Sequence, residues 1–326
     1  MRHIATLVVV VAGLAAVPVV AVGQELGRFE RTLTVSAPVA LAIVSGSGSV
    51  DVRSGPDGSV RVIGSIRAAD RWRTNEQDSR SAVRVVEENP PIVQEGNRID
   101  LGLISDPDVD RRVSISYEVI VPRATRLTSR TGSGSQKVAA LAGPVSVTTG
   151  SGSVEVGAID GGVDVSTGSG SVNVESGRER VFINTGSGTV HAGTVAGDLL
   201  IRTGSGGIHV EQVSDGTADL RTGSGSVELR RLDGGLSANT GSGSITVSGI
   251  PRRDWTVSSS SGQLALRIPA GTPFRIQANS SSGSIETDHD LQTSTVSRRE
   301  LTGTAGQGGP LVTARTSSSR IAIRTE

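Results

Sequence analysis

Two histidines and one glutamate occupy matching positions in consecutive segments in the middle of the chain. His191, His209 and Glu228 follow one another at intervals of 18 and 19 residues. Imidazole nitrogens and carboxylate oxygens are common ligands of Zn²⁺ and Ni²⁺, and these side chains would meet if the segments stack as strands about 4.8 Å apart. The opposing interpretation is two surface histidines that share a column, because nothing in the neighbouring sequence would orient the imidazoles. We therefore predict no metal and no cofactor, and keep His191, His209 and Glu228 as the candidate ligand set.

A second acidic pattern lies at Asp106, Asp108 and Asp110. A calcium-binding loop needs glycine at its sixth position and a carboxylate at its twelfth, where this chain has Arg111 and Tyr117. We expect a solvated hairpin loop at these aspartates rather than a calcium site.

Arginines also recur one segment apart, at Arg202 and Arg221, and Arg230 and Arg231 follow shortly after. Stacked guanidinium groups bind anionic glycans or phosphates in other proteins. The simpler interpretation, which we favour, is a solvated face that keeps the protein soluble.

The remaining outward acids, Asp164, Asp219 and Glu228, are single rather than paired. Glycoside hydrolysis requires two carboxylates with opposed roles in one groove. Segments between residues 145 and 255 are so short that no loop can build such a groove. The sequence therefore predicts a protein that is not an enzyme.

A repeat sets the elements that carry these side chains. Thr-Gly-Ser-Gly recurs at intervals of 18 residues, with one interval of 19, and begins at Thr131, Thr149, Thr167, Thr185, Thr203, Thr222 and Thr240. From Thr149 onward, apolar residues stand two and four positions before each of these threonines and five and seven positions after it, which is the alternation of strands. The alternation changes phase across Gly-Ser-Gly, which indicates a corner, and we expect glycine there because it adopts positive φ freely. The threonine is in phase with the inward residues, so its hydroxyl should join a Thr/Ser ladder.

One such segment cannot bury its apolar side alone, so the segments must stack. The sequence predicts an all-β fold, a single-stranded parallel β-solenoid (β-helix) of about 18 residues per coil. Helical repeats are excluded, because the helical period is absent and there are 43 glycines.

The two ends depart from the repeat. For residues 24–125 we predict strands and one short helix at about 74–88, which ends at Asn89-Pro90-Pro91. We expect this helix to cap the open end of the solenoid. Residues 126–326 contain the repetitive solenoid, interrupted at about 289–309. We expect residues 24–326 to form one continuous domain.

The start of the chain and its composition predict an exported protein. Residues 1–23 have a short basic start, an apolar run and a small-residue cleavage pattern, as in a signal peptide. An uncleaved anchor is the alternative, since the run is about long enough to span a bilayer; after cleavage we expect no transmembrane segment. The absence of cysteine excludes disulfides and thiolate sites. Basic and acidic residues both number 32, which argues against a nucleic-acid partner.

The repeat and both ends together resemble a known family, the bacterial "putative-adhesin" domain family of exported β-solenoids of unknown function. The matching residues are the serial Thr-Gly-Ser-Gly-Ser-Val corners, Asn89-Pro90-Pro91 after the short helix, and residues 301–310 before the last coil. The later corners depart from the pattern, because glycine is lost at positions 260, 281 and 318. The resemblance implies the fold and an exported location, in the periplasm or at the cell surface.

These observations lead to one expected function and two alternatives. We expect an exported, non-enzymatic, adhesin-like protein whose repetitive Ser/Thr-rich face binds a cell-envelope, glycan or protein partner by many weak contacts. The first alternative is a periplasmic scaffold or signalling partner. The second is a polysaccharide-active β-helix enzyme. The ligand and the oligomeric state do not follow from the sequence.

Overall fold

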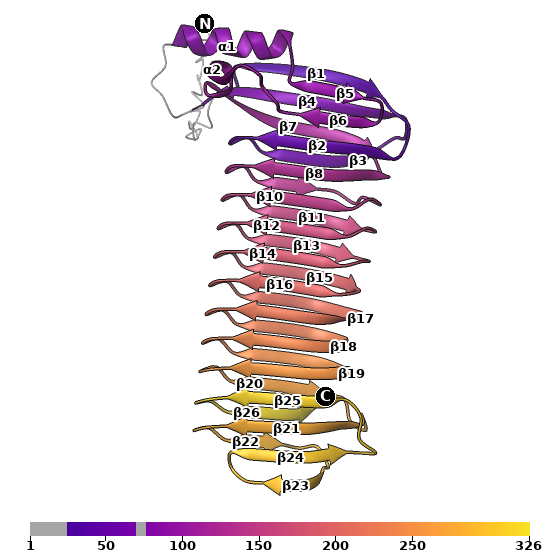
Figure 1. Cartoon of the computed structure of the whole chain (residues 1–326), viewed down its shortest axis with the longest axis vertical. Coiled ribbons are helices and arrows are strands. Elements are labelled where there is room, and N and C mark those ends of the chain that lie inside the picture. Colours follow the sequence, from indigo (N-terminus) through magenta and orange to yellow (C-terminus); the bar gives the residue numbers. More distant parts are fainter. Residues whose placement is uncertain (1–24, 70–75) are drawn as a thin grey trace, which may run out of the picture.

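The computed structural model describes residues 25–69 and 76–326 of the chain. They form the predicted β-solenoid, a tall stack of strands (Figure 1). Each regular coil contributes one strand before the Thr-Gly-Ser-Gly corner and one after it. Strands of successive coils pair in parallel at matching repeat positions, for example Val163 with Val181 and Val172 with Val190. The predicted fold class is confirmed. The predicted signal segment 1–23 and positions 74 and 75 of the predicted helix lie outside the described residues.

Two faces result from this pairing. The first face holds the strands before each corner: β2 (Val39–Ser45), β8 (Thr125–Thr131), β10 (Val145–Thr149), β12 (Val163–Thr167), β14 (Val181–Thr185), β16 (Leu199–Thr203), β25 (Leu311–Thr316) and β21 (Phe274–Ser280). The second face holds the strands after it: β3 (Val50–Gly55), β9 (Gln136–Val138), β11 (Val154–Ile159), β13 (Val172–Gly177), β15 (Val190–Ala196), β20 (Leu264–Ile268), β26 (Ile321–Thr325) and β22 (Ile285–Thr287). Three long strands begin in the second face and end in the first: β17 (Ile208–Thr222), β18 (Val227–Thr240) and β19 (Ile245–Ser259).

The core between the faces is one continuous cluster of apolar side chains, mostly Val, Leu, Ile and Ala, from Phe29 to Ile323. The corner threonines are buried beside it, as predicted, but they do not form the predicted hydroxyl-to-hydroxyl ladder. Thr185 Oγ1 donates to the Gly170 carbonyl of the preceding corner at 3.1 Å and accepts from the Gly188 amide of its own corner at 3.1 Å. Each hydroxyl therefore satisfies backbone groups that the corner would otherwise bury unpaired.

The corner glycines also differ from expectation. None of the Thr-Gly-Ser-Gly glycines lies in the positive-φ region. Glycine is needed at these positions because stacked corners approach one another closely. A Cβ on Gly170 would overlap the Gly152 carbonyl oxygen of the neighbouring coil. Positive φ occurs elsewhere in the repeat, and one such residue is Asp215, whose φ is 62° and which lies where the repeat carries an extra residue. There the register between β17 and β18 shifts, which absorbs the 19-residue interval.

Antiparallel strands and helices close the N-terminal end of the stack. On the second face β1 (Gly27–Thr34) pairs with β4 (Ser59–Ala68), which pairs with β7 (Val113–Pro122). On the first face β5 (Ile92–Glu95) pairs with β6 (Arg98–Leu101). The predicted cap is α1 (Glu76–Glu88), which contacts β1 and β4 (Figure 1).

A second helix, α2 (Pro107–Asp110), replaces the hairpin loop expected at the three aspartates, so that expectation was wrong. Asp106 caps this helix, because its Oδ1 accepts the Asp108 amide at 2.8 Å, and proline fits its first position.

Stacking order and chain order differ at both ends. The coil of β2 and β3 lies between β6–β7 and β8–β9, both of which come later in the chain. The last coil, β25 and β26, lies between β19–β20 and β21–β22, both of which come earlier. Beyond β21 the C-terminal edge of the first face is closed by the antiparallel strands β24 (Glu300–Ala305) and β23 (Gln292–Val296). Neither helix in the described part of the chain has the length and apolar character needed to cross a bilayer.

Candidate functional site

The histidine column is assembled as the sequence predicted, on the outer side of the second face. The rings of His191, on β15, and His209, on β17, stack with centroids 4.9 Å apart and an interplanar angle of 12°. His209 Nδ1 lies 3.4 Å from Glu228 Oε2, on β18. Because the rings are nearly parallel, their nitrogens lie side by side rather than converging on one point.

Glu228 is already engaged by a cation. Arg230 donates to Glu228 Oε1 at 2.7 Å, and this hydrogen bond holds the pKa of Glu228 below its ordinary value, with a smaller contribution from His209. Arg230 also lies 3.6 Å from Glu211. Within residues 25–69 and 76–326, no group of three or more histidine, aspartate and glutamate side chains is placed to hold a metal ion. The arrangement is a stacked pair joined to an exposed ion-pair network.

The four candidate arginines do not form one cluster. Arg202 and Arg221 are register neighbours on the first face. Arg221 pairs with Asp219 at 2.9 Å, whereas Arg230 and Arg231 lie in the part of β18 before the first face and contact Glu211.

The outward residues that directly precede the corners form a continuous column on the first face, here called the donor column. It consists of Arg130, Thr148, Ser166, Asn184, Arg202, Arg221, Asn239, Ser258 and Arg315. It holds hydroxyl, amide and guanidinium groups, and no carboxylate. In the described part of the chain, Arg130, Arg202 and Arg315 form no ion pair. The column therefore presents a polar side chain at every coil, whereas Arg221 is paired with Asp219 and the Asn239 amide donates to Ser258.

The outward acids lie apart from one another. Asp164 stands on β12, Asp219 is held by Arg221, and Glu228 is held by Arg230. Asp164 and Asp219 lie on the first face and Glu228 on the second, so these three do not form the facing pair of carboxylates that glycoside hydrolysis uses.

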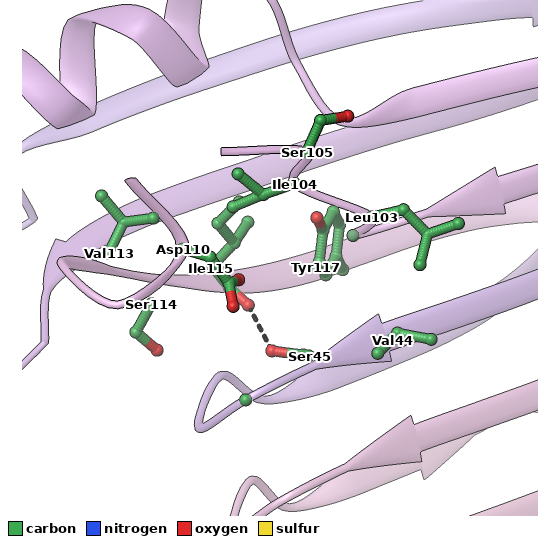
Figure 2. Close-up of a pocket in the computed structure, with 12 residues that line it drawn as sticks. Val44, Ser45, Leu103, Ile104, Ser105, Asp110, Val113, Ser114, Ile115 and Tyr117 are labelled. Atoms are coloured by element: carbon green, nitrogen blue, oxygen red, sulfur yellow. Dashed lines mark hydrogen bonds between the residues drawn. The ribbon is translucent and has the colours of Figure 1, made fainter. Parts of the chain in front are cut away.

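A hollow under the N-terminal cap was not predicted from the sequence. It has a volume of about 380 Å³ and lies between β7, the end of β2 and the segment that links β6 to α2 (Figure 2). Its apolar lining includes Val44, Leu103, Ile104, Val113, Ile115 and Tyr117. We call it the cap hollow. Leu103, two residues after β6, has a side chain that is 60% exposed at this rim.

Tyr117 contributes the one buried polar side-chain group that stands without a partner in this lining. The residue is 2% exposed, and its hydroxyl has no hydrogen-bond partner among the described residues. Burial raises the pKa of the Tyr117 hydroxyl above its ordinary value, and the nearby Asp110 carboxylate raises it further. The group is thus a neutral phenol, able to donate one hydrogen bond and accept others.

The fold and surfaces define a class: a β-solenoid that presents repeated polar columns and an apolar hollow under its N-terminal cap. The family model described as Toastrack DUF4097 matches residues 40–324, so the chain belongs to the Toastrack DUF4097 family. No curated protein matches the chain.

Solved structures of three bacterial proteins are similar to the chain. One, from Parabacteroides distasonis, is described as a putative adhesin; the identity is 12%, the match covers 74% of this chain and 97% of that one, and the TM-score is 0.45. A second protein from the same organism, described as a putative lipid binding protein, has 16% identity, coverage of 75% and 98%, and a TM-score of 0.36. A putative cell adhesion protein from Clostridium sporogenes has 9% identity, coverage of 92% and 100%, and a TM-score of 0.19.

Proposed function

We propose that the protein is exported and binds, without catalysis, an extended glycan of the cell envelope or cell surface through its first face. The observation that carries this proposal is the donor column, which repeats hydroxyl, amide and guanidinium groups in register. A polymer that repeats hydroxyl or acidic groups is the kind of partner that such a column fits, because guanidinium groups recognise carboxylates and sulfates in a fixed geometry.

Repetition supplies the affinity in this proposal. A single exposed contact of this kind is worth less than about 1 kcal/mol. Contacts made by one chain on successive coils act together, because each bound unit raises the effective concentration of the next. Affinity should therefore rise with the length of the oligosaccharide.

Binding to size-fractionated alginate, an anionic glycan, tests the proposal, with dextran as the neutral comparison. The mature chain should bind long alginate fragments more tightly than short ones. Replacing Arg130, Arg202 and Arg315 together by glutamine should weaken binding to the long fragments about tenfold. The matched control replaces Arg267, Arg298 and Arg299, which are exposed and lie outside the column, and should bind like wild type.

Equal losses in the two triple variants would show that only net charge matters, and would overturn the role of the donor column. Release of new reducing ends or unsaturated sugars during incubation would overturn the non-enzymatic proposal in favour of a polysaccharide-active enzyme.

Location is tested by protease treatment of intact cells. Loss of the chain from unopened cells would support an adhesin-like surface protein. Protection until the envelope is opened would instead support the periplasmic scaffold or signalling partner.

A further inference from the structure

We propose that the cap hollow is a binding site for a small neutral or cationic amphiphile, whose apolar body fills the hollow and whose polar atom hydrogen-bonds to the Tyr117 hydroxyl. This site lies at the cap and is separate from the donor column, so the inference goes beyond the proposed glycan binding.

The volume and lining of the cap hollow indicate the size and the apolar character of the ligand. About 380 Å³ lies within the range of small-molecule sites, which are concave and mostly apolar with few polar groups. A second hollow of about 340 Å³ adjoins it, shares Leu103, Ile104 and Ser105, and reaches the end of α1. Val44, Val85, Val93 and Leu103, which are four of the six most exposed large apolar side chains in the described residues, line these two hollows. Apolar surface gathered in this way marks a binding site more often than isolated exposed residues do.

Tyr117 sets the polar contact. Leaving a buried hydroxyl without a partner costs about 1–3 kcal/mol. Its ring is fixed from the other side, because it meets the Phe29 ring edge-on with centroids 6.3 Å apart. In Figure 2 Tyr117 is drawn between Leu103 and the strand residue Ile115, among the residues that line the hollow. A ligand carbonyl, ether or amine that reaches this hydroxyl would satisfy it.

Charge sets the ligand class. Asp110 lines the cap hollow and Asp106 lines the adjoining one, whereas no lysine or arginine is among the described residues that line either. An anionic head group would face two carboxylates without a counter-charge. A neutral or cationic head group is therefore favoured over a carboxylate or phosphate.

Fluorescence titration of the full chain with prodan tests the proposal, because prodan is a neutral naphthalene with one carbonyl acceptor. We expect saturable binding with a shift of emission to shorter wavelength. Tyr117→Phe keeps the ring and should weaken binding about tenfold, as expected for the loss of one hydrogen bond. Leu103→Glu, at the rim, should weaken binding by more than this, since it adds charge to the apolar entrance.

Two controls make the result decisive. Val296→Glu changes an equally exposed apolar residue, 68% exposed on β23 at the far end, and should bind like wild type. The prodan analogue with a carboxylate in place of the propionyl group should bind at least about tenfold more weakly. Thermal melting of each variant verifies that the fold is kept.

The proposal is overturned by an absence of saturable binding to wild type, or by equal binding to wild type and Leu103→Glu. Unchanged affinity in Tyr117→Phe overturns it as well, because the ligand class rests on that hydroxyl. Equal affinity for the carboxylate analogue overturns the charge assignment and with it the proposed class.

Discussion

The middle of the solenoid and its two ends solve the same packing problem differently. Between β10 and β18 each coil pairs with the coil before it and the coil after it in the chain. At the ends, β2–β3 is inserted between β6–β7 and β8–β9, and β25–β26 between β19–β20 and β21–β22, so that two coils that follow one another in the chain are separated in the stack. A repeat contains no signal to stop, so the ends need a separate device.

That device has a physical purpose. An exposed end coil presents unpaired backbone groups and invites association with other strands. Here the inserted coils β2–β3 and β25–β26 are paired on both sides. The edges beyond them are antiparallel strands such as β1 and β23, and the three-residue strand β22 on the second face. The ends therefore resist fraying and block edge-to-edge growth of the stack, whereas the coils of the middle are equivalent to one another.

The largest expected effect comes from deletions. Removing residues 163–180 joins two equivalent positions and should leave a cooperative fold whose melting temperature falls by a few degrees, because a solenoid loses one coil and re-forms the same interface. Removing residues 310–326 withdraws the inserted coil and should lower the melting temperature by more than about 10 °C or cause aggregation. Calorimetry and light scattering measure both, and similar behaviour of the two variants would contradict the distinction between middle and end.

Alanine substitutions at equivalent corner glycines sharpen the comparison. Gly168→Ala should cost about 1–3 kcal/mol of unfolding free energy, because its Cβ would overlap the Gly150 carbonyl oxygen of the coil below. Gly46→Ala occupies the same corner position in the inserted N-terminal coil, has no atom within 4 Å of the added Cβ, and should be neutral. Chemical denaturation gives both values. A neutral Gly168→Ala would show that stacked corners can move apart.

The sequence predicted the regular coils because each coil shows the same apolar columns as the next. It did not predict the inserted ends, since residues 311–325 carry those columns too and nothing local specifies which coils they join. The pairing of Trp255 with Val312 depends on how all the coils stack, and no local feature of the sequence specifies it. The corner glycines were predicted for the wrong reason, because close approach of stacked backbones appears only after assembly.

The candidate surfaces divide in the same way. The histidine column followed from repeat positions and was placed correctly. The cap hollow could not be predicted from repeat positions, because it is formed by α2, β7 and the end of β2, which lie far apart in the chain. Leu103 was the available signal, as an apolar residue directly before a turn-rich acidic segment.

A medium effect is expected at the corner threonines. Thr185→Val keeps shape and volume but leaves the Gly188 amide and the Gly170 carbonyl without their hydroxyl partner, so it should cost about 1–3 kcal/mol. Thr185→Ser keeps both hydrogen bonds, as Ser259 does at a later corner, and should cost less than about 1.5 kcal/mol. If valine were tolerated as well as serine in denaturation experiments, the hydroxyl would have no role in holding the corners.

The smallest effect concerns pH at the inserted C-terminal coil. Asp288 accepts the Thr325 amide at 2.6 Å and the Thr325 hydroxyl at 3.0 Å, and it lies 3.8 Å from Arg324. The Thr325 amide contributes most to lowering the pKa of Asp288 below its ordinary value of 3.8. A carboxylate with a lowered folded pKa stabilises above its unfolded pKa, and this stability disappears as the pH falls through the folded value.

The end of β26 should therefore loosen at acid pH while the middle coils remain ordered. Asp288→Asn should lower the melting temperature by less than about 2 °C near neutral pH, and the difference from wild type should disappear as the pH falls through the lowered pKa of Asp288. Hydrogen exchange at Thr325, compared with Thr185 in the middle, resolves the two regions in one sample. If the exchange rate at acid pH rose equally at both positions, packing alone would hold the inserted coil. The hydrogen bonds from Thr325 to Asp288 would then contribute nothing to the difference in stability between the end and the middle.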